Sequence, residues 1–435
     1  MDTSNKVVGA QFIEPAGSMN GIPTVVCSSP IYGRYRLEIR RLEDLAKRWQ
    51  KSLVNFLRDM VRIPSLSGRE EKIARRAKAE MERAGFDEVF IDGIGNVVGR
   101  IGSGRVRILY DAHMDTVDIG DRKSWKHDPF AAEHKGGTIY GRGACDDKAG
   151  VASSIYGGKL ILALGLKGDY TLYIVASVEE ESAGGRGIEY LLAEDRLKPH
   201  FVVLAEPSSL NIIRGHKGRV GLKISVRGKS AHAGTPWKGI NAIYKMAPLI
   251  QKIEKLNSRL PSSPLLGKGT ISVTKIDCEK ASLNAIPDNC TIYLDRRTND
   301  QETLQSVKRE LRTLMGRGAK LEILQKFFPA WELPRRHPLV ASSIEAYKTL
   351  FGSNPKILLW PFCSNGSYTM GEKDIPTIIF GPGEERFAHS ANEQVKVEHL
   401  VKAAMFYALL PGIIVKRWSK SQNIAPSGLS GQAKK

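Results

Sequence analysis

Apolar segments that end in acidic residues or histidine constrain this chain more than any other feature. The segment LYIVASVEEES, residues 172–182, runs from an apolar, partly β-branched stretch into Glu179, Glu180 and Glu181. Such a stretch is typical of a strand buried inside a parallel sheet. Adjacent carboxylates at the end of a buried strand repel one another, so the fold has to supply something that neutralises them.

Several other apolar segments end in the same way. RILYDAHMD, FVVLAEPSS and TIIFGPGEERFAH each run into histidine or carboxylate residues, and GRGACDDKAG places two aspartates before a helical pattern. In open α/β sheets, sites form at the carboxyl ends of the strands. Histidine and carboxylate together suit zinc or a similar divalent ion. The candidate residues are His113, Asp115, Asp146, Glu179, Glu180, Glu206 and His389.

Two divalent cations would answer the charge problem. A set of His113, Asp146, Glu180, Glu206 and His389 carries three negative charges, close to what two divalent ions and a bridging hydroxide need. Bound cations keep such carboxylates ionised in spite of burial. Neighbouring residues on a strand point in different directions, so one glutamate of the run is free to act as a general base.

Helical patterns alternate with the apolar segments and predict an α/β fold, with a mixed, mainly parallel sheet flanked by helices. From residue 217 to 329 the texture changes to strand, helix, two strands and helix, which predicts an inserted ferredoxin-like α+β domain. The predicted division is an extension of undetermined structure at 1–48, a large domain from 49–216 and 330–418, the insertion at 217–329, and a disordered basic tail at 419–435.

Composition excludes some classes of protein. The formal net charge is +19, but the basic residues are spread along the chain, so we predict no nucleic-acid partner. No apolar run approaches the ~20 residues that span a bilayer, and we predict no membrane association. The five cysteines are scattered and lack CxxC spacing, which predicts a reducing, cytoplasmic compartment and no disulfide framework.

An ordered series of motifs resembles the M20 metallopeptidases, the family of acetylornithine deacetylase, succinyl-diaminopimelate desuccinylase and carboxypeptidase G2. The motifs are HMDTV, GRGACDDKAG, VEEES, AEPSS, SAHAGTP, NAIP and FGPGEERFAHSANE, and the similarity covers about residues 50–415. Within the family, the chain is most similar to the selenium-metabolism hydrolase branch. The resemblance implies a zinc-exopeptidase-like catalytic domain with an inserted lid and dimerisation domain.

The resemblance also implies roles for single residues. Asp146 would bridge two zinc ions (cobalt and manganese being alternatives), Asp115 would orient His113, and Glu179 would be the general base. The remaining metal ligands would be His113, Glu180, Glu206 and His389. A cis peptide bond between Asp146 and Asp147 is expected.

The resemblance implies a catalytic role for one residue of the insertion, His232, and substrate binding for two others. Asn284 and Arg297 would hold a substrate carboxylate, with Arg296 as the alternative to Arg297. His232 would reach the active site of a second subunit, which implies a homodimer through the lid domain.

The implied activity is hydrolysis of the amide bond of an N-acyl amino acid by metal-activated water. A dipeptidase or carboxypeptidase of the same fold is an alternative, and a metal-free scaffold is another. Two departures from the family pattern bear on this activity. Val178 stands where relatives have Asp before the paired glutamates, and CSNGS replaces a glycine-rich loop that lines the substrate site.

Overall fold

The structure is a computed structural model that describes residues 30–193, 197–278 and 282–422. It divides into two units, Met1–Arg41 and Leu42–Lys435. In the first unit, the described residues belong to the start of α1 (Pro30–Val61), which therefore begins inside the predicted extension. Most of the predicted tail, residues 423–435, lies outside the described residues.

The large sheet of the second unit has nine strands among the described residues, in the order β1-β2-β6-β3-β7-β17-β8-β15, with β16 paired to β8. The neighbours β6, β3, β7 and β17 run parallel to one another, which confirms the predicted mainly parallel sheet. The strands are β1 (Glu88–Ile91), β2 (Val97–Ile101), β3 (Val106–His113), β6 (Tyr170–Ser177), β7 (Phe201–Leu204), β8 (Ile212–His216), β15 (Trp331–Glu332), β16 (Ile357–Trp360) and β17 (Thr377–Ile379).

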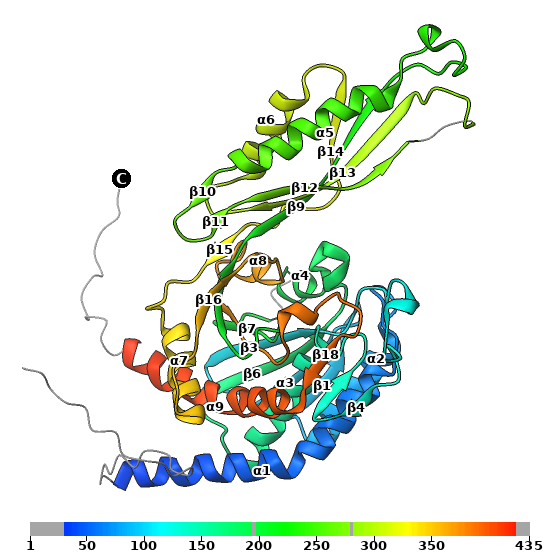
Figure 1. Ribbon diagram of the computed structural model, residues 1–435. Coiled ribbons are helices and arrows are strands. Elements are labelled where there is room, and N and C mark those ends of the chain that lie inside the picture. The colour runs from blue at the N-terminus through cyan, green and yellow to red at the C-terminus, as the bar shows by residue number, and fades with distance from the viewer. Residues whose placement is uncertain (1–29, 194–196, 279–281, 423–435) are drawn as a thin grey trace, which may run out of the picture. The chain divides into compact units, whose positions relative to one another are not determined.

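Helices flank this sheet (Figure 1). They are α2 (Glu71–Ala84), α3 (Lys148–Leu164), α4 (Arg186–Ala193), α7 (Pro338–Phe351), α8 (Gly366–Thr369) and α9 (Val397–Gln422). Helix α3 packs against both β3 and α9, and its residue Gly157 permits this packing, because a Cβ there would lie 2.7 Å from the Cβ of Tyr407. A small sheet of β4 (Glu133–Lys135), β5 (Thr138–Tyr140) and β18 (Gln394–Lys396) completes this part of the fold.

Helix α9 is unusually apolar for a helix of this length. Its segment Val397–Ser419 is long and apolar enough to cross a membrane by length and composition, but 72% of its most apolar stretch is buried inside the protein. The helix packs against α3 and α7 and supplies residues such as Phe406 and Leu410 to the large core. Its apolar character is therefore accounted for by the core.

The segment from residue 218 to 323 forms a separate antiparallel sheet with its own core. Its strand order is β12-β13-β9-β14, and α5 and α6 pack together beside it (Figure 1). This is the order of a ferredoxin-like βαββαβ unit. The elements are β9 (Gly218–Arg227), α5 (Ala242–Arg259), β12 (Thr270–Asp277), β13 (Asn289–Thr298), α6 (Leu304–Met315) and β14 (Ala319–Ile323), with a small hairpin of β10 (Ser262–Ser263) and β11 (Gly267–Lys268). We call this segment the inserted domain.

Candidate active site

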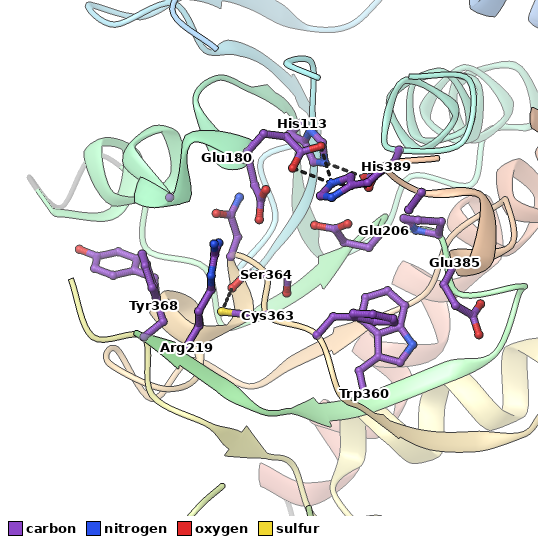
Figure 2. A pocket seen from close by; sticks show the side chains of 18 of the residues that line it. His113, Glu180, Glu206, Arg219, Trp360, Cys363, Ser364, Tyr368, Glu385 and His389 are labelled. Atoms are coloured by element: carbon purple, nitrogen blue, oxygen red, sulfur yellow. Dashed lines mark hydrogen bonds and ion pairs between the residues drawn. The ribbon is translucent and has the colours of Figure 1, made fainter. Parts of the chain in front are cut away.

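Histidine and acidic side chains converge at the carboxyl ends of β3, β6 and β7, on the wall of a cavity of about 290 Å³. Figure 2 shows His113, Glu180, Glu206 and His389 directed toward one another. Two groups of side chains there could each hold a metal ion: His113, Asp146 and Glu206 form one, and Asp146, Glu181 and His389 form the other. In each group the ligand atoms lie within 4.8 Å of one another.

Asp146 belongs to both groups. Its Oδ1 lies 3.0 Å from Nε2 of His113, and its Oδ2 lies 3.4 Å from Nε2 of His389. Its backbone N–H donates to the buried carboxylate of Glu393 at 2.8 Å, which fixes the turn before α3. The peptide bond between Asp146 and Asp147 is cis, as predicted.

His113 is held in one orientation from behind. Its Nδ1 lies 2.9 Å from the backbone oxygen of Asp115 and 3.5 Å from Oδ1 of the same residue. A carbonyl oxygen can only accept a hydrogen bond, so Nδ1 carries the proton. Nε2 is therefore the atom available to a metal. Burial opposes protonation of His113, but hydrogen bonds to Asp115 and Asp146 outweigh burial and raise its pKa well above the ordinary value.

Asp115 also holds the acidic turn that follows β6. Its carboxylate accepts hydrogen bonds from the backbone N–H of Glu180 at 3.1 Å and of Glu181 at 3.0 Å, and from Oγ of Ser67 at 2.6 Å. Burial raises the pKa of Asp115, but hydrogen bonds from His113 and from these donors overcome that effect and lower it. Asp115 therefore stays ionised. It positions both the imidazole of His113 and the turn that carries Glu180 and Glu181.

The three glutamates after β6 do not share one orientation. Glu179 has a φ of 52°, and its side chain makes an ion pair with Arg186 at 3.1 Å, outside the residues that line the cavity. Its backbone N–H donates to Glu70. The left-handed residue turns the chain so that the two following glutamates, in the π-helical turn Glu180–Gly184, line the cavity.

This turn places the glutamate run differently from the prediction. The structure does not bring Glu179 into the cavity, and it places Glu181, which was not among the predicted ligands, 2.8 Å from His389. Glu180 is half-buried and lines the cavity beside both groups, but it belongs to neither. The sequence contained a signal for this arrangement. Relatives have an acidic residue before the paired glutamates. If Glu179 takes that position, the paired glutamates are Glu180 and Glu181, and Val178 no longer departs from the family pattern.

The carboxylates of the cavity are costly to ionise in the absence of a cation. Burial raises the pKa of Glu180 to about 8, although the attraction of His113 acts in the opposite direction. The nearby charge of Glu181 adds to the effect of burial. Burial and the charge of Glu180 raise the pKa of Glu206 well above its usual range. A divalent cation reverses both effects. The donor set of imidazole nitrogens and carboxylate oxygens therefore fits such an ion.

The inserted domain supplies two arginines to the same cavity, Arg219 from β9 and Arg297 from β13. Both donate from Nε to the carboxylate of Asp295, at 2.9 Å and 2.7 Å. The neighbouring Arg296 points to the other face, where it is fully buried beside Glu302. Alternation along β13 therefore selects Arg297 over Arg296 as the residue at the cavity.

Two predicted residues of the inserted domain lie elsewhere. His232 and Asn284 are exposed, and neither lines the cavity. Nδ1 of His232 accepts from the backbone N–H of Gly234 at 3.0 Å, and Oδ1 of Asn284 accepts from Oγ of Ser282 at 2.7 Å. Their backbones meet, because the N–H of Ala233 donates to the oxygen of Asn284 at 2.8 Å.

The rest of the cavity is aromatic and polar, and its aromatic residues were not predicted. Phe328, Trp360, Phe362 and Tyr368 line it, as does the predicted CSNGS loop through Cys363–Asn365. Figure 2 shows Trp360 and Glu385 on one side and Arg219, Cys363 and Tyr368 on another. The sequence carried no pattern that identifies these aromatics, since they come from separate segments.

Residues 109–411 match the model of peptidase family M20/M25/M40, and the chain belongs to this family. The Escherichia coli K12 protein YgeY, of uncharacterised function, is 39% identical over 383 residues, covering 84% of this chain and 95% of that protein. The acetylornithine deacetylase of Proteus mirabilis is 28% identical over 367 residues, covering 79% and 91% of the two chains.

A solved structure shares the fold. It is the Bacillus subtilis protein YXEP, described as a dinuclear metal binding peptidase from the M20 family; its TM-score is 0.62 at 20% identity, with 85% of this chain and 99% of that chain covered. Members of the M20 family depend on metal and act on amide bonds, so this chain is a hydrolase of amide bonds. The predicted family is confirmed, and its selenium-metabolism branch stays a prediction.

Proposed function

We propose that this hydrolase binds two divalent cations, zinc first among them, and cleaves the amide bond of an N-acyl amino acid. The observation that carries the proposal is the pair of ligand groups that share Asp146 on the wall of one cavity. The name of the related acetylornithine deacetylase supports the acyl amino acid, and the description of the Bacillus subtilis protein as dinuclear supports two metals.

The chain offers a matching charge for this pair of ions. Asp146, Glu181 and Glu206 supply three negative charges, and His113 and His389 supply neutral nitrogen ligands. Glu181 takes the ligand role that was predicted for Glu180. When bound, the ions polarise the amide carbonyl and lower the pKa of water.

Glu180 is the proposed general base, in place of Glu179. Its carboxylate lines the cavity next to both ligand groups without belonging to either, whereas the Glu179 carboxylate is paired with Arg186. Glu180 would accept a proton from the attacking water and pass it to the leaving amine. Such proton transfer typically contributes ~10²–10⁴-fold to the rate.

Arg297 and Arg219 are proposed to bind a free carboxylate of the substrate. The two guanidinium groups share the single carboxylate of Asp295, so one positive charge is left over at the cavity wall. Arginine presents paired N–H donors that match a carboxylate. Fixing this end of the substrate would set the scissile amide over the ligand groups.

His232 and Asn284 are proposed to act in a homodimer joined through the inserted domain. Both are exposed and neither lines the cavity of its own chain, which supports a role at the cavity of a second copy. His232 would then donate a hydrogen bond to the developing oxyanion. In this arrangement a monomer has nearly no activity, and mixing inactive His232→Ala and Glu180→Gln chains restores part of it.

Amine release tests the proposal. The full chain is loaded with zinc, cobalt or manganese and assayed on N-acetyl, N-succinyl and N-carbamoyl amino acids and on dipeptides. Glu180→Gln is expected to lose at least ~10²-fold in kcat while its metal content stays at two ions. Glu179→Gln, the matched control one residue earlier, is expected to keep most activity. The reverse order of the two variants would return the base role to Glu179.

The same assay separates the alternatives. Turnover of dipeptides without turnover of acylated amino acids would make the protein a dipeptidase or carboxypeptidase, as the structural relative's description as a peptidase suggests. Failure to bind any of the three metals would favour the metal-free scaffold.

A further inference from the structure

Two cysteines of the inserted domain face each other across neighbouring strands. Their Sγ atoms lie 2.8 Å apart. Cys278 directly follows β12, and Cys290 is in β13. The register pairs Asp277 with Thr291, so the next position along the ladder sets Cys278 opposite Cys290. Residues paired across antiparallel strands have Cα atoms ~4.5–5.5 Å apart, which is inside the range that a disulfide spans.

The two thiols differ in access to solvent. Cys290 is fully buried in the core of the inserted domain, whereas Cys278 is partly exposed at its edge. Burial and the neighbouring thiol raise the pKa of Cys290 to about 12. An external reagent therefore reaches Cys278 first, and Cys290 is placed to react with Cys278.

The surroundings of this pair do not supply the ligands of a metal site within the part of the chain that the structure describes. Structural zinc sites use four ligands. Among the described residues, neither cysteine belongs to a group of histidine, cysteine or carboxylate side chains that could hold an ion. In a reducing compartment, the remaining chemistry for two adjacent thiols is reversible oxidation, since cytosolic disulfides are usually transient.

We propose that Cys278 and Cys290 form a reversible disulfide, with a low-molecular-weight disulfide such as glutathione disulfide as the oxidant. The Cys278 thiolate attacks one sulfur of the oxidant, which forms a mixed disulfide and releases one thiol. Cys290 then gives up its proton and attacks the Cys278 sulfur, which releases the second thiol. The protein loses two protons and two electrons, and the oxidant gains them as it becomes two thiols.

The bond would clamp residues 282–286, which include Asn284 and precede Cys290. They are held against residues 231–233 by two hydrogen bonds, from Ile286 N–H to the oxygen of Ala231 and from Ala233 N–H to the oxygen of Asn284, both at 2.8 Å. A covalent link close to these hydrogen bonds reduces the freedom of the two segments to separate. The proposal rests on the sulfur geometry and is independent of the proposed substrate and metals.

Oxidation of the full chain tests the proposal. The metal-loaded protein is incubated with glutathione disulfide, denatured, alkylated and mapped by peptide mass. We expect a cross-linked peptide pair that joins Cys278 to Cys290 and is lighter by two hydrogens than the two reduced peptides together. Dithiothreitol should return the two separate peptides. Cys290→Ser should instead keep glutathione on Cys278, and Cys363→Ser, the matched control, should keep the cross-link.

Hydrogen exchange tests the clamp. In the oxidised protein, the amides of residues 231–233 and 282–286 should exchange several-fold more slowly than in the reduced protein. Alkylation of both cysteines after oxidation, or a cross-link to another cysteine, would overturn the disulfide. A cross-link without slower exchange would overturn the clamp. If Cys290→Ser does not fold, Cys290→Ala is used in its place. The peptide map of the oxidised wild-type protein tests the disulfide even if neither variant folds.

Discussion

The buried His216 at the end of β8 predicts how stability changes in mild acid. Its Nδ1 donates to the oxygen of Lys217 at 2.9 Å, and its Nε2 accepts from Nε1 of Trp331 at 2.8 Å and lies 3.0 Å from Oγ of Ser364. The ring is fully buried. Burial, and to a smaller extent the Arg297 charge, lowers the pKa of His216 to about 4, although the hydrogen bond to Lys217 acts in the opposite direction.

The pKa of His216 sets the sign and size of the effect. In the unfolded chain the imidazole has its ordinary pKa of 6.5, so it binds a proton as the pH falls below that value. The folded chain stays neutral at this position until the pH reaches about 4. The free energy of unfolding therefore decreases between these two pH values and not above them. At about 1.4 kcal/mol per pKa unit, the full loss is about 3.5 kcal/mol, of which about 3 kcal/mol has occurred at pH 4.

Urea unfolding of His216→Gln against the wild type measures this loss. A chelator is present throughout, so that metal release in acid does not contribute. Glutamine does not titrate, so the advantage of the wild type over the variant should shrink by about 3 kcal/mol from pH 7 to pH 4. His134→Gln, at an exposed position of β4, is the control. Parallel pH profiles for wild type and His216→Gln, or an NMR titration of the His216 ring near its ordinary pKa, would refute the reasoning.

Three other outcomes follow from buried contacts. Glu393→Gln places amide hydrogens against the N–H donors of Arg142 and Asp146, so the free energy of unfolding in urea should fall by about 3 kcal/mol. Unchanged stability would contradict these contacts. Ile292→Ala opens the core of the inserted domain and should cost about 2–5 kcal/mol, whereas a loss below that of a surface substitution would count against this core. Asp115→Asn should weaken metal binding ~10–100-fold by calorimetry, and equal affinity would show that Asp115 does not position His113.

The sequence by itself determined the family, through its ordered motifs, and also the mainly parallel sheet and the position of the site. The sheet and the site could be predicted because apolar segments specify buried parallel strands, and the carboxyl ends of such strands meet at one edge of the sheet. His113, Glu206 and His389 were identified in this way, and Asp146 from the pair of aspartates before a helical pattern. The structure brings all four together.

The tertiary structure alone decided which way side chains point where regular structure ends. In β13, side chains alternate between the two faces of the sheet, so Arg297 and Arg296 point in opposite directions. The glutamate run lies in a turn, where no regular alternation of side chains predicts their directions. There, the left-handed φ of Glu179 and the hydrogen bonds that Asp115, 65 residues before Glu180, accepts from the turn direct Glu180 and Glu181 into the cavity. The pairing of Cys278 with Cys290 has the same origin, because strand register depends on contacts across the whole sheet.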